Sequence, residues 1–314
     1  MERKNITLPT PIEKQPIQVS DWEVAVGEFL RSLDRKQTTR ALYGRTLRLF
    51  FEWVQTTGRN ISELTGADII EYKETLLARK LSPLSVSSYL TSISKFYAWT
   101  ESRKVYPNIA NGVHSPKRGK AFMKQHLSED KVRELLSHFE CNIRDFAIVN
   151  LLLRTGLRTV ELVRADVGDI VFKGDRRVLL VWGKGRDAKD SFVVLSKKAW
   201  EPIRRYLDTR HALPGEPLFT SSSHRNTGGR LTTRTVSYIC KEGMKAIGLD
   251  DRAFTAHSLR HTTAVSILRH GGSLDAAQLV LRHSDPATTQ VYVESFKEEF
   301  RLKNAPELLI DSAF

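Results

Sequence analysis

The chain has 314 residues, which is enough for two domains of ordinary size, each with its own core. Lys and Arg outnumber Asp and Glu by 49 to 36, and the formal net charge of +13 indicates a surface that attracts polyanions such as nucleic acids. No apolar stretch approaches the roughly 18 residues that span a bilayer, and no apolar signal core follows the first residues, so we expect neither a membrane anchor nor a secretory signal. The two cysteines, Cys141 and Cys240, are too few for a disulfide framework and fit free thiols in a reducing cytoplasm.

The first part of the sequence predicts a small all-helical domain over residues 20–105. Residues 1–19 contain several prolines, and we expect a disordered leader there. The run Ser20-Asp21-Trp22-Glu23 is typical of a capping box and predicts that Ser20 precedes the first helix. Apolar residues at helical spacing predict a second helix from about Thr39 to Gly58, a third over residues 69–77, and a fourth that begins after Ser82-Pro83.

Residues 106–121 interrupt this periodicity with prolines, glycines and a basic cluster, which is typical of a linker. Residues 122–300 follow as a second domain, whose first helix is expected to start at Ser128. Three short β-rich runs, over residues 169–172, 177–182 and 191–195, are separated by glycine-containing turns and predict a three-stranded antiparallel sheet. The domain is predicted to be α+β and mostly helical, because helical patterns resume at about Ser196, Thr233, Ser258, Leu274 and Pro286.

Three runs in this second domain combine the residue types that metal-free phosphodiester chemistry needs. They are Thr155-Gly156-Leu157-Arg158, His257-Ser258-Leu259-Arg260, and the run from Leu281 to Tyr292 that includes His283. A phosphodiester repels nucleophiles because its oxygens are negative, and arginine offsets that charge through paired hydrogen bonds from a planar, always charged guanidinium. Gly156 predicts a helix break that projects Arg158 from a helix start, which favours Arg158 over Arg154 one turn upstream.

The order Arg, His-x-x-Arg, His, Tyr resembles the catalytic signature of the tyrosine recombinases, the phage-integrase family, and in particular its compact Xer-type members. The resemblance covers nearly the whole chain. It implies a two-lobed, mainly α-helical DNA clamp, with an all-α N-terminal domain and an α+β catalytic domain that carries the small antiparallel sheet. It also implies a site-specific DNA recombinase that cleaves and rejoins DNA through a covalent 3′-phosphotyrosyl intermediate. The catalytic residues carried over by this resemblance are Arg158, Lys184, His257, Arg260, His283 and Tyr292.

The resemblance assigns a role to each of these side chains. Glu161, three residues after Arg158, supports it by orienting the guanidinium. Lys184, in the turn Gly183-Lys184-Gly185, protonates the 5′-oxygen leaving group, and His283 bonds a phosphate oxygen or assists proton removal from the nucleophile. Tyr292 is that nucleophile, and neighbouring cations favour the phenolate of a group whose pKa is ordinarily about 10.

The expected partner is double-stranded DNA with inverted-repeat core sites, bound by a protein that assembles into a tetramer on the DNA. No metal or other cofactor is expected, since no Cys/His or acidic cluster has ligand spacing. Because only about 20 residues precede the first helix, we expect no separate arm-binding domain. The apolar tail over residues 301–314 is expected to dock on a neighbouring protomer, or else to fold back on its own domain. Basic residues expected at the DNA, although each also suits a solvated surface, are Arg40, Arg45, Arg48, Lys95, Lys117 and Arg118.

Two departures from the family pattern bear on the alternatives. Arg282 stands where the family usually has glycine, and arginine would strain a turn that needs a positive φ. Asp190-Ser191 occupies a commonly basic position after the hairpin lysine. A type IB topoisomerase shares the nucleophile chemistry, and a DNA-binding regulatory protein that has lost the chemistry shares the fold, so both remain as alternatives to a recombinase.

Overall fold

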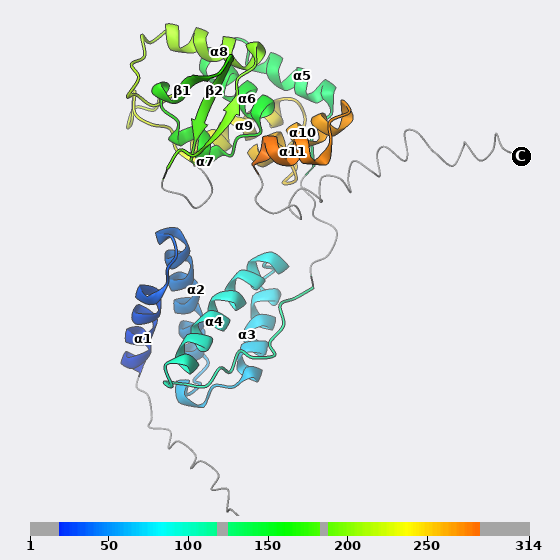
Figure 1. Ribbon diagram of the computed structural model, residues 1–314. Helices are drawn as coiled ribbons and strands as arrows, with labels where there is room; N and C mark the ends of the chain where they lie inside the picture. Colours follow the sequence, from blue (N-terminus) through cyan, green and yellow to red (C-terminus); the bar gives the residue numbers. More distant parts are fainter. Residues whose placement is uncertain (1–18, 118–124, 183–187, 283–314) are drawn as a thin grey trace, which may run out of the picture. The chain divides into compact units, whose positions relative to one another are not determined.

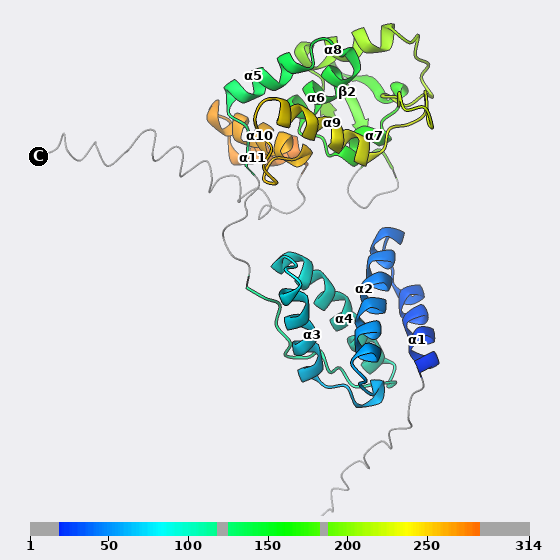
Figure 2. The same cartoon turned by 180° about the vertical axis from the view of Figure 1, so that it is seen from behind.

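The computed structural model describes residues 19–117, 125–182 and 188–282, with side chains from Trp22 onward. The chain divides into two compact units, residues 1–121 and 122–314 (Figures 1 and 2). The predicted leader, the tail over residues 301–314 and the predicted helix at Pro286 lie outside the described residues, apart from the last residue of the leader. No helix in the described part of the chain is long and apolar enough to cross a bilayer.

The described residues of the first unit form a bundle of four α-helices and a short 3₁₀ helix, drawn in blue to cyan in Figure 1. These elements are α1 (Val19–Ser32), α2 (Gln37–Thr56), η1 (Ile61–Glu63), α3 (Gly66–Ala78) and α4 (Pro83–Ser102). Aromatic side chains dominate the core: the Trp22 ring lies 5.3 Å from that of Phe51 and 5.7 Å from that of Phe96. These two pairs are tilted, whereas Phe29 stacks on Tyr43 and meets Phe96 edge-on. Such aromatic pairs add to the stability that burial of each ring gives, so the bundle has a core of its own.

Local sequence signals set most helix ends of this bundle. Ser82 caps α4 by accepting a hydrogen bond from the Ser85 amide, as predicted, with Pro83 in the first turn. Gly58 follows the end of α2 in a left-handed conformation (φ +68°), which confirms it as the stop. The prediction that Ser20 caps the first helix is wrong, because α1 already includes Val19 and Ser20 therefore lies inside the helix.

The second unit, over residues 125–182 and 188–282, is mostly helical with one small sheet. Its helices are α5 (Glu129–His138), α6 (Ile143–Thr155), α7 (Thr159–Arg164), η2 (Val167–Asp169), α8 (Lys197–Asp208), α9 (Thr233–Ala246), α10 (Ala256–Arg269) and α11 (Leu274–Leu281). Ser128 caps α5 as predicted. α10 begins at Ala256, two residues before the predicted start at Ser258, because Thr255 is the N-cap and Ser258 occupies the third helical position.

The predicted three-stranded antiparallel sheet is confirmed. It consists of β1 (Ile170–Lys173), β2 (Arg176–Val181) and β3 (Ser191–Val194) in the order β1-β2-β3. Val171 pairs with Val178, and Leu179 pairs with Val193. Gly174 turns the first hairpin at φ +60°, a conformation that costs glycine little.

α6 is the centre of this unit. It is buried over nearly its whole length, and it packs against α8, α9 and α10. Both Figures 1 and 2 draw it between α8 and the α10–α11 pair. A helix held on several sides fixes the backbone at its end firmly, and the end of α6 leads directly into the first predicted catalytic run.

Candidate active site

The junction between α6 and α7 presents Arg158. Gly156 ends α6 in the left-handed region (φ +59°, ψ +27°), and Arg158 is the N-cap of α7 with extended backbone angles. The helix break that the sequence predicts at Gly156 is therefore confirmed. The competing residue Arg154 remains on α6, where its Nε donates to the Asn150 side chain at 2.8 Å. The Arg158 side chain is 25% exposed, which leaves its guanidinium accessible at a helix N-terminus, where the backbone N–H groups also favour anions.

Glu161 accepts hydrogen bonds from two arginines. Its Oε1 lies 2.6 Å from Arg158 Nη1, and its Oε2 lies 2.8 Å from the Arg158 backbone nitrogen. Arg282 Nη2 donates to the same Oε2 at 2.7 Å. Burial by itself would raise the pKa of the Glu161 carboxyl, but the charge of Arg282, then the backbone bond and charge of Arg158, outweigh it and hold that pKa below its ordinary value. Glu161 is thus an ionised carboxylate that fixes two guanidinium groups.

α10 carries the His-x-x-Arg pair. His257 is exposed, whereas Arg260 is buried with only 1% of its surface accessible. The Arg260 guanidinium donates to the carbonyl oxygens of Gly156 and Leu281. Gly156 lies two residues before Arg158, and Leu281 lies two residues before His283. Arg260 therefore ties together the chain segments that lead into two other predicted catalytic residues.

Arg282 is a site residue that the sequence pattern did not assign. It is the C-cap of α11 with φ +55° and ψ +46°. Arg282 therefore has the positive φ that would favour the family's usual glycine at this position. Its side chain is 11% exposed and reaches Glu161 across 121 residues of sequence. The sequence signals at Arg282 are its replacement of the usual glycine and its place directly before His283, but neither predicts the contact with Glu161, because no local spacing links α11 to α7.

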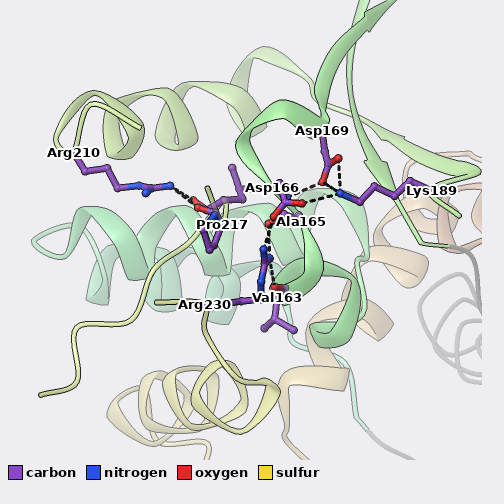
Figure 3. A network of polar contacts seen from close by, with 9 residues as sticks. Val163, Ala165, Asp166, Asp169, Lys189, Arg210, Pro217 and Arg230 are labelled. Carbon is purple, nitrogen blue, oxygen red and sulfur yellow. Dashed lines mark hydrogen bonds and ion pairs between the residues drawn. The ribbon is translucent and has the colours of Figure 1, made fainter. Parts of the chain in front are cut away.

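Lys184, His283 and Tyr292 lie outside the described residues, as does Arg118. The residues that follow position 187 are described, and ion pairs hold Lys189 in place there (Figure 3). Lys189 Nζ lies 2.9 Å from Asp166 Oδ2 and 2.6 Å from Asp169 Oδ2, and Arg230 pairs with the other oxygen of Asp166. The basic side chain next to Asp190 is therefore engaged by carboxylates just after α7.

The predicted DNA-facing residues that the structure describes in the first unit are exposed. Arg40, Arg45 and Arg48, on α2, line a shallow hollow of about 400 Å³ together with Leu30 and Gln37. Lys95 on α4 and Lys117 after it are also exposed. No group of three or more His, Cys, Asp or Glu side chains suited to a metal ion occurs among the residues that the structure describes.

Models of known protein families match both units of the chain. The model of the phage integrase family matches residues 125–299, and that of the N-terminal SAM-like domain of phage integrases matches residues 25–106. The chain belongs to the phage integrase family. This confirms the resemblance that the Arg, His-x-x-Arg, His, Tyr order indicated.

Named relatives narrow the activity. The chain is 32% identical to the tyrosine recombinase XerC of Leptospira interrogans over 275 residues, which cover 84% of this chain and 85% of the relative. It is 29% identical to the tyrosine recombinase XerD of Brucella melitensis over 300 residues, covering 88% and 94%. The protein is a site-specific tyrosine recombinase, an enzyme that cleaves and rejoins DNA.

Solved structures share the fold. A XerH site-specific recombinase bound to a palindromic difH substrate aligns with a TM-score of 0.74 at 15% identity, covering 95% of this chain and 99% of that one. A lambda integrase dimer bound to a COC′ core site aligns with a TM-score of 0.69 at 18% identity, covering 88% and 95%. The predicted fold, mainly α-helical with a small antiparallel sheet, is therefore confirmed.

Proposed function

We propose that this recombinase cleaves one DNA strand by attack of the Tyr292 phenolic oxygen on the scissile phosphorus. The phenol loses its proton with the assistance of His283 as the 3′-phosphotyrosyl bond forms, the bond between the phosphorus and the 5′-oxygen breaks, and this leaving oxygen takes up a proton. A 5′-hydroxyl from another strand reverses the step, so the bond energy is conserved and neither ATP nor another energy source is consumed. The main support is the Arg260 guanidinium, which joins the carbonyl two residues before Arg158 to the carbonyl two residues before His283.

The roles of the side chains follow from the charge that develops on the phosphate. Arg158 and Arg260 offset the negative charge of the transition state, with His257 and His283 bonding its oxygens. Lys184 supplies the proton for the 5′-oxygen, because an ammonium at a turn beside other cations loses a proton more readily than an isolated one. Glu161 is a supporting residue that orients Arg158 through the contacts described above.

The substrate that we propose is double-stranded DNA with two inverted core half-sites around a short spacer. Support comes from the net charge of +13 and from the bound DNA of two structures with the same fold, one with a palindromic substrate and one a dimer on a core site. Arg40, Arg45, Arg48, Lys95, Lys117 and Arg118 are the proposed contacts to the phosphate backbone. A reducing cytoplasm is the compartment that suits the free thiols of Cys141 and Cys240.

A nicked suicide substrate tests the nucleophile, because the cleaved strand diffuses away and traps the covalent complex. Tyr292→Phe should abolish the DNA-linked protein band on a denaturing gel while DNA affinity stays within a few-fold, since only the attacking oxygen is lost. Tyr238→Phe, which alters an exposed tyrosine on α9, is the matched control and should form the complex normally. A covalent band with Tyr292→Phe would show that another residue is the nucleophile. If the wild type formed no covalent band, the alternative of a regulatory DNA-binding protein would be favoured.

Plasmid relaxation separates recombination from topoisomerase activity. A recombinase should leave supercoiled DNA without a core site unchanged, because it cleaves only within an assembled pair of sites. Efficient relaxation of such a plasmid would instead favour the type IB topoisomerase alternative.

We also propose that four protomers assemble on two sites, with the apolar tail over residues 301–314 docked on the neighbouring protomer. Ending the chain after Lys303 should spare the binding of a single half-site but weaken cooperative occupation and recombination. Loss of single-site binding together with thermal stability would assign the tail to its own domain.

A further inference from the structure

Arg282 adopts a backbone conformation that does not suit it. At φ +55° and ψ +46° it lies in the left-handed region, where the Cβ atom of an L-residue approaches its own carbonyl oxygen and where glycine is favoured. Arg282 caps its own helix by donating from Nη1 to the Val280 carbonyl oxygen at 2.8 Å, but a glycine at this position would end α11 without strain. Capping therefore does not explain why an arginine stands here.

The side chain does something that glycine cannot do. The side chain is almost enclosed, at 11% exposed, and its guanidinium donates from Nη2 to Glu161 Oε2 at 2.7 Å. Glu161 is itself only 4% exposed, so this ion pair is shielded from solvent and stronger than a surface pair. Burial lowers the pKa of Arg282, whereas the Glu161 charge works in the opposite direction.

Glu161, Arg158 and Arg282 together carry one positive charge that no carboxylate of the group offsets. One carboxylate faces two guanidinium groups, with Arg158 at 2.6 Å from Oε1 and Arg282 at 2.7 Å from Oε2. If Arg282 were removed, Arg158 and Glu161 would form a neutral pair, and the field of Arg158 at a nearby phosphate would be largely cancelled. With Arg282 present, the three groups carry one net positive charge, and Arg158 retains its attraction for an anion.

We propose that Arg282 is a positioning residue for strand cleavage: it shares the Glu161 carboxylate with Arg158, so that Glu161 orients the Arg158 guanidinium without neutralising it. This inference rests on the proposed role of Arg158 at the scissile phosphate. The strain of the left-handed arginine is the cost of placing a second cation there, on the residue directly before His283.

Arg282→Gly tests the proposal because it relieves the backbone strain and removes the cation. The single-turnover rate of covalent complex formation on a suicide substrate, at saturating enzyme, should fall roughly tenfold, which is less than the roughly 10²–10³-fold loss when a direct donor to the reacting oxygen is removed. Affinity for a half-site should change little, because a single pair of charges is altered within a large basic surface. Arg282→Lys keeps the charge and should retain most of the rate.

A double variant distinguishes charge sharing from a structural role. In Arg282→Gly/Glu161→Gln the net positive charge of the group is restored, and a glutamine oxygen still accepts the Arg158 backbone N–H. The double variant should therefore cleave faster than Arg282→Gly alone. If Arg282 only shaped the end of α11, the second substitution would lower the rate further, and the proposal would be overturned.

The remaining controls keep the outcomes separate. Arg204→Gly removes an arginine on α8 that pairs with Glu201 and Asp208, far along the chain from the site residues, and should leave the cleavage rate unchanged. Thermal unfolding of each variant identifies any loss of rate that comes from unfolding. If Arg282→Gly is unfolded, the cleavage rate of Arg282→Lys relative to the wild type tests the role of the charge instead. A wild-type cleavage rate for Arg282→Gly would refute the proposed role of Arg282 but not the proposed nucleophile. A covalent complex formed by Tyr292→Phe would refute the proposed nucleophile, and the comparison of the Arg282 variants would still test the role of Arg282.

Discussion

The Arg260 guanidinium donates a hydrogen bond to the carbonyl oxygen of Gly156, although 104 residues separate the two in sequence. Gly156 ends α6, and Arg158 begins α7 two residues later, so a side chain of α10 holds the turn that presents Arg158. A second bond from Arg260 to the Leu281 carbonyl fixes the end of α11 in the same way. A carbonyl oxygen near the end of a helix lacks its usual partner, and Arg260 supplies one from inside the protein.

Replacing Arg260 by lysine should therefore destabilise the protein as well as impair cleavage. Lysine keeps the charge, but its single nitrogen cannot reproduce a planar fork that reaches two carbonyl groups. Leaving buried carbonyl groups without donors should lower the free energy of unfolding by about 2–4 kcal/mol, measured by urea unfolding. Arg204→Lys, at an exposed site on α8, is the control and should behave as the wild type. Full stability of Arg260→Lys would show that the two carbonyl bonds contribute little.

Gly156→Ala should also be strongly destabilising, for two separable reasons. The left-handed conformation at φ +59° costs an L-residue about 1–2 kcal/mol, and an added Cβ would lie 2.6 Å from Leu281 Cδ2 in a packed core. Gly248→Ala isolates the first cost, since Gly248 has φ +80° and open space around its Cβ position. The difference between the two variants in thermal midpoint measures the steric part. Equal midpoints would mean that the Leu281 side chain moves aside freely.

Elements with strong local signals could be predicted from the sequence. The three strands and the helix starts after Ser82 and Ser128 are set by residues next to them in the chain, through turns, caps and alternating apolar residues. The errors were also local. Ser20 has the pattern of a cap but lies inside α1, and Ser258, the predicted start of a helix, is the third residue of a helix that Thr255 caps.

The candidate site was predictable in its residue types but not in its contacts. Spacing alone placed Glu161 against Arg158, because three residues at a helix start bring the two together. The contacts from Arg260 to Gly156 and from Arg282 to Glu161 span 104 and 121 residues, and no periodicity encodes which side chains meet after α10 packs on α6 and α11 packs on α10. The Arg282 contact therefore required the structure.

The ion pairs of Lys189 predict a specific pH dependence. Burial raises the pKa of Asp166, but the hydrogen bonds and charges of Arg230 and Lys189 outweigh it, so that pKa lies below its ordinary value of 3.8. A depressed carboxyl pKa contributes stability that is present above the ordinary pKa and is lost as the pH falls through the folded value. Lys189→Met should therefore lower the free energy of unfolding by about 1–3 kcal/mol at pH 7, and the gap to the wild type should shrink below about pH 4.

Urea unfolding between pH 3 and pH 7 measures this gap. Arg204→Met, which breaks a solvent-exposed group of ion pairs on α8, is the control and should change stability much less at every pH. A Lys189→Met effect that stayed constant down to pH 3 would mean that Lys189 contributes through the packing of its side chain rather than through its charge.

Strand cleavage should not respond to EDTA. The positive charge that a divalent metal ion supplies in many phosphoryl-transfer enzymes is provided in our proposal by arginine, lysine and histidine side chains, chiefly Arg158, Arg260 and Lys184, and these bind no exchangeable ion. The yield and rate of the covalent complex on a suicide substrate should be the same in excess EDTA as in buffer with Mg²⁺. A Mg²⁺-dependent nuclease in the same buffer verifies that chelation is complete. Loss of the complex in EDTA, restored by added Mg²⁺, would contradict the metal-free mechanism and require a search for carboxylate ligands close to Arg158.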